Sequence, residues 1–194
     1  MAACGVGDSP AGEEQRETIN ISISLYLLVD DKEDPNPALS SRRTEGELLA
    51  ILDGMNEIWS QAGIRLELES IGTLEVPEAV LRAVSAGNLR AFFDELGGSI
   101  DPPQSATING FYTRRLGRAN GISVLGSRSF FVIDEPSVFD RRVSSHEVGH
   151  ILGLHHVLSD RGRLLYSGTN GMRLTEDEAA VARNGAQQLI EAVR

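Results

Sequence analysis

The chain has 194 residues, which suits a single domain with a short tail and is enough to bury a hydrophobic core. The net charge is −10 and Lys and Arg form no cluster, which argues against nucleic acid or an anionic membrane surface as a partner. The one cysteine, Cys4, excludes an intramolecular disulfide and a cysteine-rich zinc site. No apolar run reaches the roughly 18 residues of a transmembrane segment.

The first part of the chain predicts a leader followed by a strand–helix–strand unit. Residues 1–17 are rich in small and polar residues without a period, so we expect a flexible leader before one domain over residues 18–194. Apolar residues alternate from 19 to 29 and again from 64 to 69, which predicts two strands. Between them, Thr44 and Glu47 form a capping-box pattern that opens a helix, and Gly63 ends it.

The polar segment 30–43 joins the first strand to this helix and predicts a loop. It carries four acids that could hold a structural calcium ion: Asp30, Asp31, Glu33 and Asp34. A solvated acidic loop is the preferred interpretation, because runs of like charge are usually exposed.

The second part of the chain mixes strands and helices, and it predicts an α/β or α+β fold. Residues 77–96 are typical of one or two helices with a break at Gly87, and 97–105 of a loop. The remaining elements are expected as strands at 107–112, 121–125 and 129–133, a helix at 141–152, a loop at 153–173 and a last helix opened by Thr175 and Glu178.

Residues 146–156 carry a metal-binding pattern. His146 and His150 are four residues apart, so on a helix they project from the same face and can reach one zinc ion. Glu147 lies beside the first histidine, where its carboxylate can approach a water on the metal without being a ligand. A catalytic zinc usually has three protein ligands. Gly153 can end the helix, and His156 is the preferred third ligand, with His155 as the alternative.

This stretch matches the signature of the metzincin family, His-Glu-x-x-His-x-x-Gly-x-x-His, at every fixed position. The order of elements, and Leu174-Thr175 at the start of the last helix, resemble bacterial matrixin-like members. The resemblance implies a zincin/metzincin fold, in which a mixed twisted sheet carries an active-site helix and a C-terminal helix. It also implies that a peptide substrate lies along an edge strand within 121–125.

The expected function is that of a zinc-dependent metalloendopeptidase. The metal would acidify its bound water and polarise the scissile carbonyl, while Glu147 moves the proton to the leaving amine. The walls of the substrate pocket are expected from the loop 163–173 and the start of the active-site helix. Two alternatives stay open, a catalytically silent binding module of the same fold and a zinc hydrolase of a non-peptide amide.

Metzincins place a methionine in a turn beneath the metal, and two residues here could fill that position. Met172 follows Asn170-Gly171, a strong turn signal, and is preferred over Leu165. Tyr166 could hydrogen-bond the oxyanion, but its spacing favours an ordinary loop residue.

Cys4 has three interpretations. The preferred one is that Ala2-Ala3-Cys4-Gly5 resembles the end of a bacterial lipoprotein signal, so that Cys4 carries a lipid anchor and the protein is secreted or held in the cell envelope. Only three residues precede Cys4, so no complete signal peptide is visible. The other interpretations are that Cys4 has no function, or that Cys4-Gly5-Val6-Gly7-Asp8 is a degraded matrixin cysteine switch.

Overall fold

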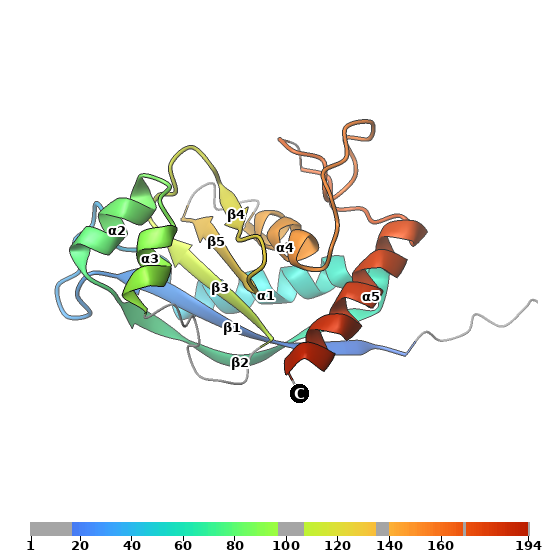
Figure 1. Cartoon of the computed structure of the whole chain (residues 1–194), viewed down its shortest axis with the longest axis horizontal. Coiled ribbons are helices and arrows are strands. Elements are labelled where there is room, and N and C mark those ends of the chain that lie inside the picture. The colour runs from blue at the N-terminus through green and yellow to red at the C-terminus, as the bar shows by residue number, and fades with distance from the viewer. Residues whose placement is uncertain (1–16, 97–106, 135–139, 169, 194) are drawn as a thin grey trace, which may run out of the picture.

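A five-stranded mixed sheet organises the molecule (Figure 1). The structure, a computed structural model, describes residues 17–96, 107–134, 140–168 and 170–193. The strand order is β2-β1-β3-β5-β4, and the first four strands are parallel while β4 runs antiparallel to β5 at the edge. In chain order the strands are β1 (Ile19–Val29), β2 (Ile64–Glu75), β3 (Ile108–Thr113), β4 (Gly121–Ser123) and β5 (Ser129–Ile133).

Helices cover both faces of this sheet. The helical elements are α1 (Glu45–Trp59), the 3-10 turn η1 (Ser60–Ala62), α2 (Glu78–Ser85), α3 (Arg90–Glu95), α4 (Asp140–Ile151) and α5 (Glu176–Val193). One core layer packs α1, α4 and α5 against the sheet, and the other packs α2 and α3 against its opposite face. Because side chains alternate along a strand, Ile23 and Leu25 of β1 enter the first layer while Tyr26 and Leu28 enter the second.

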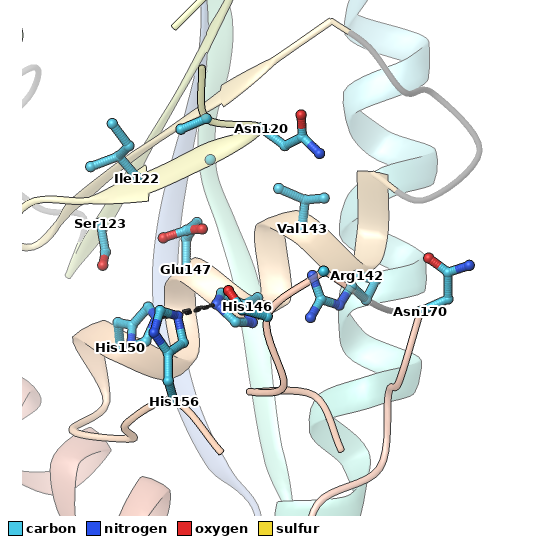
Figure 2. Close-up of a pocket in the computed structure, with 14 residues that line it drawn as sticks. Asn120, Ile122, Ser123, Arg142, Val143, His146, Glu147, His150, His156 and Asn170 are labelled. Atoms are coloured by element: carbon cyan, nitrogen blue, oxygen red, sulfur yellow. Dashed lines mark hydrogen bonds between the residues drawn. The ribbon is translucent and has the colours of Figure 1, made fainter. Parts of the chain in front are cut away.

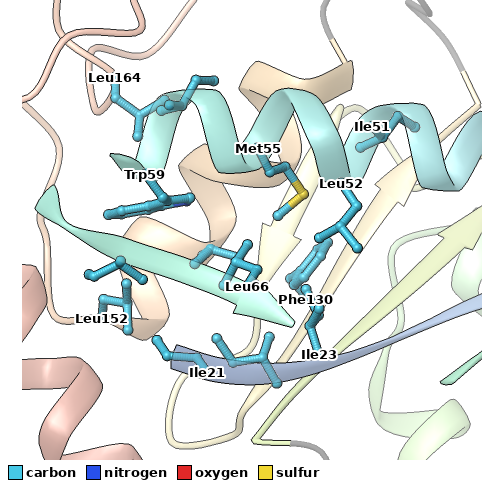
Figure 3. Packing of buried hydrophobic residues seen from close by; sticks show 14 of the residues in the cluster. Ile21, Ile23, Ile51, Leu52, Met55, Trp59, Leu66, Phe130, Leu152 and Leu164 are labelled. Atoms are coloured by element: carbon cyan, nitrogen blue, oxygen red, sulfur yellow. The ribbon is translucent and has the colours of Figure 1, made fainter. Parts of the chain in front are cut away.

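The first core layer consists of buried apolar side chains, and it supports the helix that carries the histidines (Figure 3). Trp59 and Met55 of α1 are fully buried, and they share this layer with Val148 and Leu152 of α4. Helix α4 is therefore held between α1 and the sheet, so its position depends on the core of the domain.

The predicted fold class is confirmed, as are the signals that begin and end the helices. Both capping boxes form: the Glu47 N–H donates to the Thr44 hydroxyl at 3.2 Å, and the Glu178 N–H donates to the Thr175 hydroxyl at 3.2 Å. Gly87 has a φ of +88° and separates α2 from α3.

Strand β2 is longer than the predicted 64–69 and continues to Glu75. The pairing register with β1 shifts after Leu68, where Ile23 pairs with Leu68 but Ser24 pairs with Ser70. Such a bulge inserts one residue and changes which side chains face the core. The simple alternation in the sequence therefore stops at Glu69, although the strand does not.

The acidic loop is ordered by its own hydrogen bonds. Asp30 Oδ1 accepts from the Asn36 N–H at 2.8 Å and from the Ser40 hydroxyl at 2.6 Å, and Asp31 Oδ1 accepts from the Glu33 N–H at 2.8 Å. The hydrogen bond from Ser40, followed by that from the Asn36 N–H, lowers the pKa of Asp30. Within the part of the chain that the structure describes, these acids form no cluster that could hold a metal, so the alternative of a calcium site gains no support.

The predictions on the leader and on Cys4 lie outside the described residues, apart from Glu17, whose carbonyl accepts a hydrogen bond from Arg183 at 2.8 Å. Among the described helices, none combines the length and the apolar character needed to cross a membrane.

Candidate metal centre

Three histidine side chains converge on one point (Figure 2). The Nε2 atoms of His146, His150 and His156 lie 3.1–3.2 Å from one another. Tetrahedral zinc sites have Zn–N bonds of about 2.0–2.1 Å, which sets the ligand nitrogens about 3.3 Å apart. Among the described residues this is the one group of three or more His, Cys, Asp or Glu side chains placed to share a metal ion. His155 is exposed and does not belong to it.

Backbone carbonyls fix the tautomer of two of these rings. His146 Nδ1 lies 2.8 Å from the Leu164 carbonyl, and His150 Nδ1 lies 2.9 Å from the Leu154 carbonyl. Since a carbonyl only accepts, each Nδ1 carries the proton and each Nε2 keeps a free lone pair. Burial lowers the pKa of His146 to about 4 and also lowers that of His150, so both rings are neutral at pH 7. The donor set fits a divalent metal of the zinc type.

The end of α4 brings His156 back to the other two histidines. Gly153 has a φ of +87°, and its N–H donates to the His150 carbonyl at 3.1 Å. The Leu154 N–H donates to the Gly149 carbonyl at 2.9 Å, which completes the reversal. The glycine that the sequence placed at the helix end does end it, and His156 follows three residues later.

Glu147 lies between α4 and the edge strand β4. Its side chain is buried, and desolvation raises its pKa to about 7 although hydrogen bonds from Ser123 and the charge of Arg142 act in the opposite direction. Figure 2 shows Ser123 of β4 beside Glu147. Glycine at position 121 permits this contact, because a Cβ there would lie 2.8 Å from Glu147 Oε1.

A cavity of about 500 Å³ opens beside the histidines and Glu147. As predicted, one wall comes from the start of α4 (Arg142 and Val143) and another from the loop residues Ser167, Gly168 and Asn170. The third wall is β4 with the two residues before it. The site therefore joins the three histidines, a buried carboxylate and an open hollow.

The preference for Met172 under the metal site is corrected in favour of Leu165. The Leu165 side chain is fully buried and would lie 3.1 Å from a Cβ at Gly149, which sits on α4 between the two helical histidines. Met172 is only partly buried at the border of the same core layer, and its carbonyl accepts a hydrogen bond at 2.9 Å from the side chain of Gln61 on η1. An Asn-Gly pair marks where the chain turns, but the contact of Leu165 with Gly149 decides which side chain faces the helix. Tyr166 is not among the residues that line the cavity.

Two residues of the site, Ser123 and Arg142, were not predicted from the sequence. Ser123 is an ordinary polar residue in a short strand and carries no sequence signal for its contact with Glu147. Arg142 does carry one, since it precedes His146 by four residues and so shares its face of α4. The guanidinium of Arg142 donates to the Leu164 carbonyl at 3.0 Å and to the Tyr166 carbonyl. Arg142 thus links α4 to the loop that also supplies the partner of His146.

Comparison with known proteins finds structural relatives only. No protein-family model matches the chain, and no curated protein matches its sequence. Archaemetzincin from Methanopyrus kandleri is similar over 87% of this chain and 96% of that one, with 18% identity and a TM-score of 0.58. Metalloproteinase-II from Bacteroides fragilis is similar over 88% of this chain and 55% of that one, with 13% identity and a TM-score of 0.53. A chaperone–substrate complex is similar over 89% of this chain and 35% of that one, with 17% identity and a TM-score of 0.56.

These identities are low enough that the likeness concerns the fold alone. The fold is zincin-like, of the kind found in archaemetzincin and the bacterial metalloproteinase. Within it, this chain carries a histidine triad able to bind a metal ion.

Proposed function

We propose that the protein is a zinc-dependent metalloendopeptidase of the metzincin type. The observation that carries the proposal is the convergence of three Nε2 atoms within 3.2 Å, with the buried carboxylate of Glu147 lining the same open cavity. The zincin-like fold supports it, because the structural relatives include metallopeptidases. His146, His150 and His156 would hold the metal, and Glu147 would be the catalytic residue that moves protons.

A zinc ion held by the three imidazoles would supply a Lewis acid that acidifies a water and polarises the scissile carbonyl. Glu147 would accept a proton from the attacking water and donate it to the leaving amine. Its burial makes the carboxylate more basic than an exposed one. The carbonyls of Leu164 and Leu154 keep two of the imidazole rings aimed at the same point.

An extended peptide would bind along β4. Among the described strands β4 pairs only with β5, so its outer edge can accept the backbone of another strand. The edge position was predicted for this segment, and β4 borders the cavity that contains Glu147. Pairing there would lay a scissile bond across the mouth of the histidine site.

A peptide library decides between the proposed function and its alternatives. Purified protein loaded with zinc is expected to cleave internal peptide bonds, and a chelator should stop cleavage until zinc is restored. Fragments would be identified by mass spectrometry. Binding of peptides without any cleavage would favour a catalytically silent module, whereas release of amines only from acylated small molecules would favour a non-peptide amidase.

Gly121→Ala is predicted to lower turnover while the metal stays bound. The added Cβ would lie 2.8 Å from Glu147 Oε1 and 2.9 Å from Val143 Cγ1, so the carboxylate must move from its present position. Displacement of a general base costs a sizeable part of its contribution of about 10²–10⁴-fold. Zinc content and kcat would be measured for this variant and for Gly72→Ala, a control on β2 where a Cβ meets nothing within 4 Å. Unchanged kcat for Gly121→Ala would show that the contact does not position Glu147.

A further inference from the structure

A cationic side chain forms part of the cavity wall beside the histidine site. Arg142 lines the cavity together with Asn170 and Asn120, and among the described lining residues it is the one Lys or Arg. Figure 2 shows Arg142 and Asn170 on one side of His146, with Ser123 and His150 on the other. The residue is only 8% exposed, so its charge is held largely out of bulk solvent.

Arg142 makes no direct contact with a carboxylate among the described residues, although its charge acts on nearby Glu147. Nη2 donates to the carbonyls of Leu164 and Tyr166, and Nε lies 3.4 Å from the Gly171 carbonyl. Among the described residues Nη1 has no hydrogen-bond partner, and the guanidinium forms no ion pair. Burial of a cation against neutral carbonyls is costly, so an anion that reached it would be bound strongly.

The charge of the cavity favours the same kind of ligand. Among the described residues that line the cavity, Arg142 is the one formal cation and Glu147 the one formal anion, so the negative charge does not exceed the positive one. A divalent ion on the histidines would therefore leave the cavity positive, although the whole chain carries −10. Anionic groups would therefore be attracted to this hollow.

The position of Glu147 shows which part of a substrate would face Arg142. Glu147 lines the cavity of Arg142. The neighbouring hollow past His150 has apolar residues and Arg128 in its wall, but it lacks Glu147. Since Glu147 delivers the proton to the leaving amine, that amine lies on the Arg142 side. The side chain of the residue that supplies the amine therefore enters the hollow beside Arg142.

We propose that Arg142 is a specificity-determining residue that selects peptides with an acidic residue immediately after the scissile bond. This inference rests on the proposed function. The fork of the guanidinium offers Nη1 to a carboxylate, while Nη2 stays on the loop carbonyls and holds the wall in place. Asn170 and Asn120 add amide groups that suit an anionic side chain better than an apolar one.

The test is a set of peptides that differ only in the residue after the scissile bond, with Asp, Asn, Leu or Lys there. Asp and Asn have nearly the same shape, so the ratio of their kcat/KM values reports charge recognition. We expect Asp to exceed Asn by about tenfold or more, because hydrogen bonds to a charged group exceed neutral ones by this order. Lys should be the poorest substrate.

Variants locate the preference within the cavity. Arg142→Met should remove the Asp-over-Asn preference, but it also removes bonds to the loop. Asn170→Asp is the second variant, because this exposed side chain lines the cavity and the new carboxylate would compete for Arg142 without touching the core. Asn184→Asp makes the same change of charge on an exposed site of α5 outside the cavity, and it should keep the parental ratio.

An Asp-to-Asn ratio near one in the parent protein would overturn the inference, and so would a high ratio that Asn170→Asp leaves unchanged. If no peptide is cleaved, the proposed function fails, and binding still tests Arg142. Calorimetry on the zinc-loaded protein would then compare short peptides that begin with Asp or Asn, the fragments expected on the leaving side. Tighter binding of the Asp peptide would support the inference, and equal Kd values would overturn it.

Discussion

Replacing His146 by alanine is expected to release the metal and abolish peptide hydrolysis, and His150→Ala and His156→Ala are expected to do the same. A catalytic zinc ion is held by three protein ligands, and two imidazoles leave it weakly bound and open to water. The three Nε2 atoms are 3.1–3.2 Å apart, so each ring is placed equally well to bind the metal. Zinc per chain would be measured by plasma emission after dialysis, together with hydrolysis of a peptide from the library.

His155→Ala is the matched control for these variants, because His155 adjoins His156 but is exposed and lies outside the triad. It should keep both metal and activity. His146 is buried and bonded to the Leu164 carbonyl, so its loss could also loosen the domain. Circular dichroism and Tm of the zinc-free parent and variant would separate ligand loss from unfolding. A His146→Ala protein that retains one zinc and turns over normally would refute the assignment.

Much of this site could be predicted from the sequence because the residues that form it lie close together along the chain. Four-residue spacing on a helix puts His146 and His150 on one face in any fold that keeps the helix, and Gly153 then reverses the chain. The same locality explains the two capping boxes, in which a side chain bonds to the backbone three residues away.

The parts that were missed depend on contacts between distant segments. Ser123 meets Glu147 only because β4 lies over α4, and Leu165 rather than Met172 faces Gly149 because of how the long loop folds back. Neither contact leaves a spacing in the sequence. Strand β2 shows the same limit, because its bulge opposite β1 breaks the alternation that predicts a strand.

Arg142 was predictable from the sequence in its position but not in its contacts. Its place one turn before His146 follows from the helical period, so its position on the wall could have been derived from the sequence. Its hydrogen bonds to the carbonyls of Leu164 and Tyr166 could not, since they join α4 to a loop more than 20 residues away. These bonds hold the guanidinium against the loop, and Arg142 also lines the cavity.

Glu147→Ala is expected to retain zinc near one equivalent per chain while hydrolysis falls by about 10²–10⁴-fold or more, the usual cost of losing a general base. The reason is that the three imidazoles hold the metal without Glu147, whose carboxylate is directed to β4 and the cavity. Glu147→Gln is the companion variant, because the amide keeps the shape of the side chain and can still accept a hydrogen bond from Ser123, but it cannot take up the proton. Both variants should therefore bind metal like the parent and be inactive alike.

The paired measurements of zinc content and kcat distinguish the possible roles of Glu147. Loss of zinc from Glu147→Ala with zinc retained in Glu147→Gln would mean that the side chain is a structural prop, since it is buried between α4 and β4 and alanine leaves a void there. Loss of zinc from both would make the carboxylate a ligand. Turnover like that of the parent in Glu147→Gln would overturn the mechanism, because an amide cannot carry the proton from the water to the leaving amine.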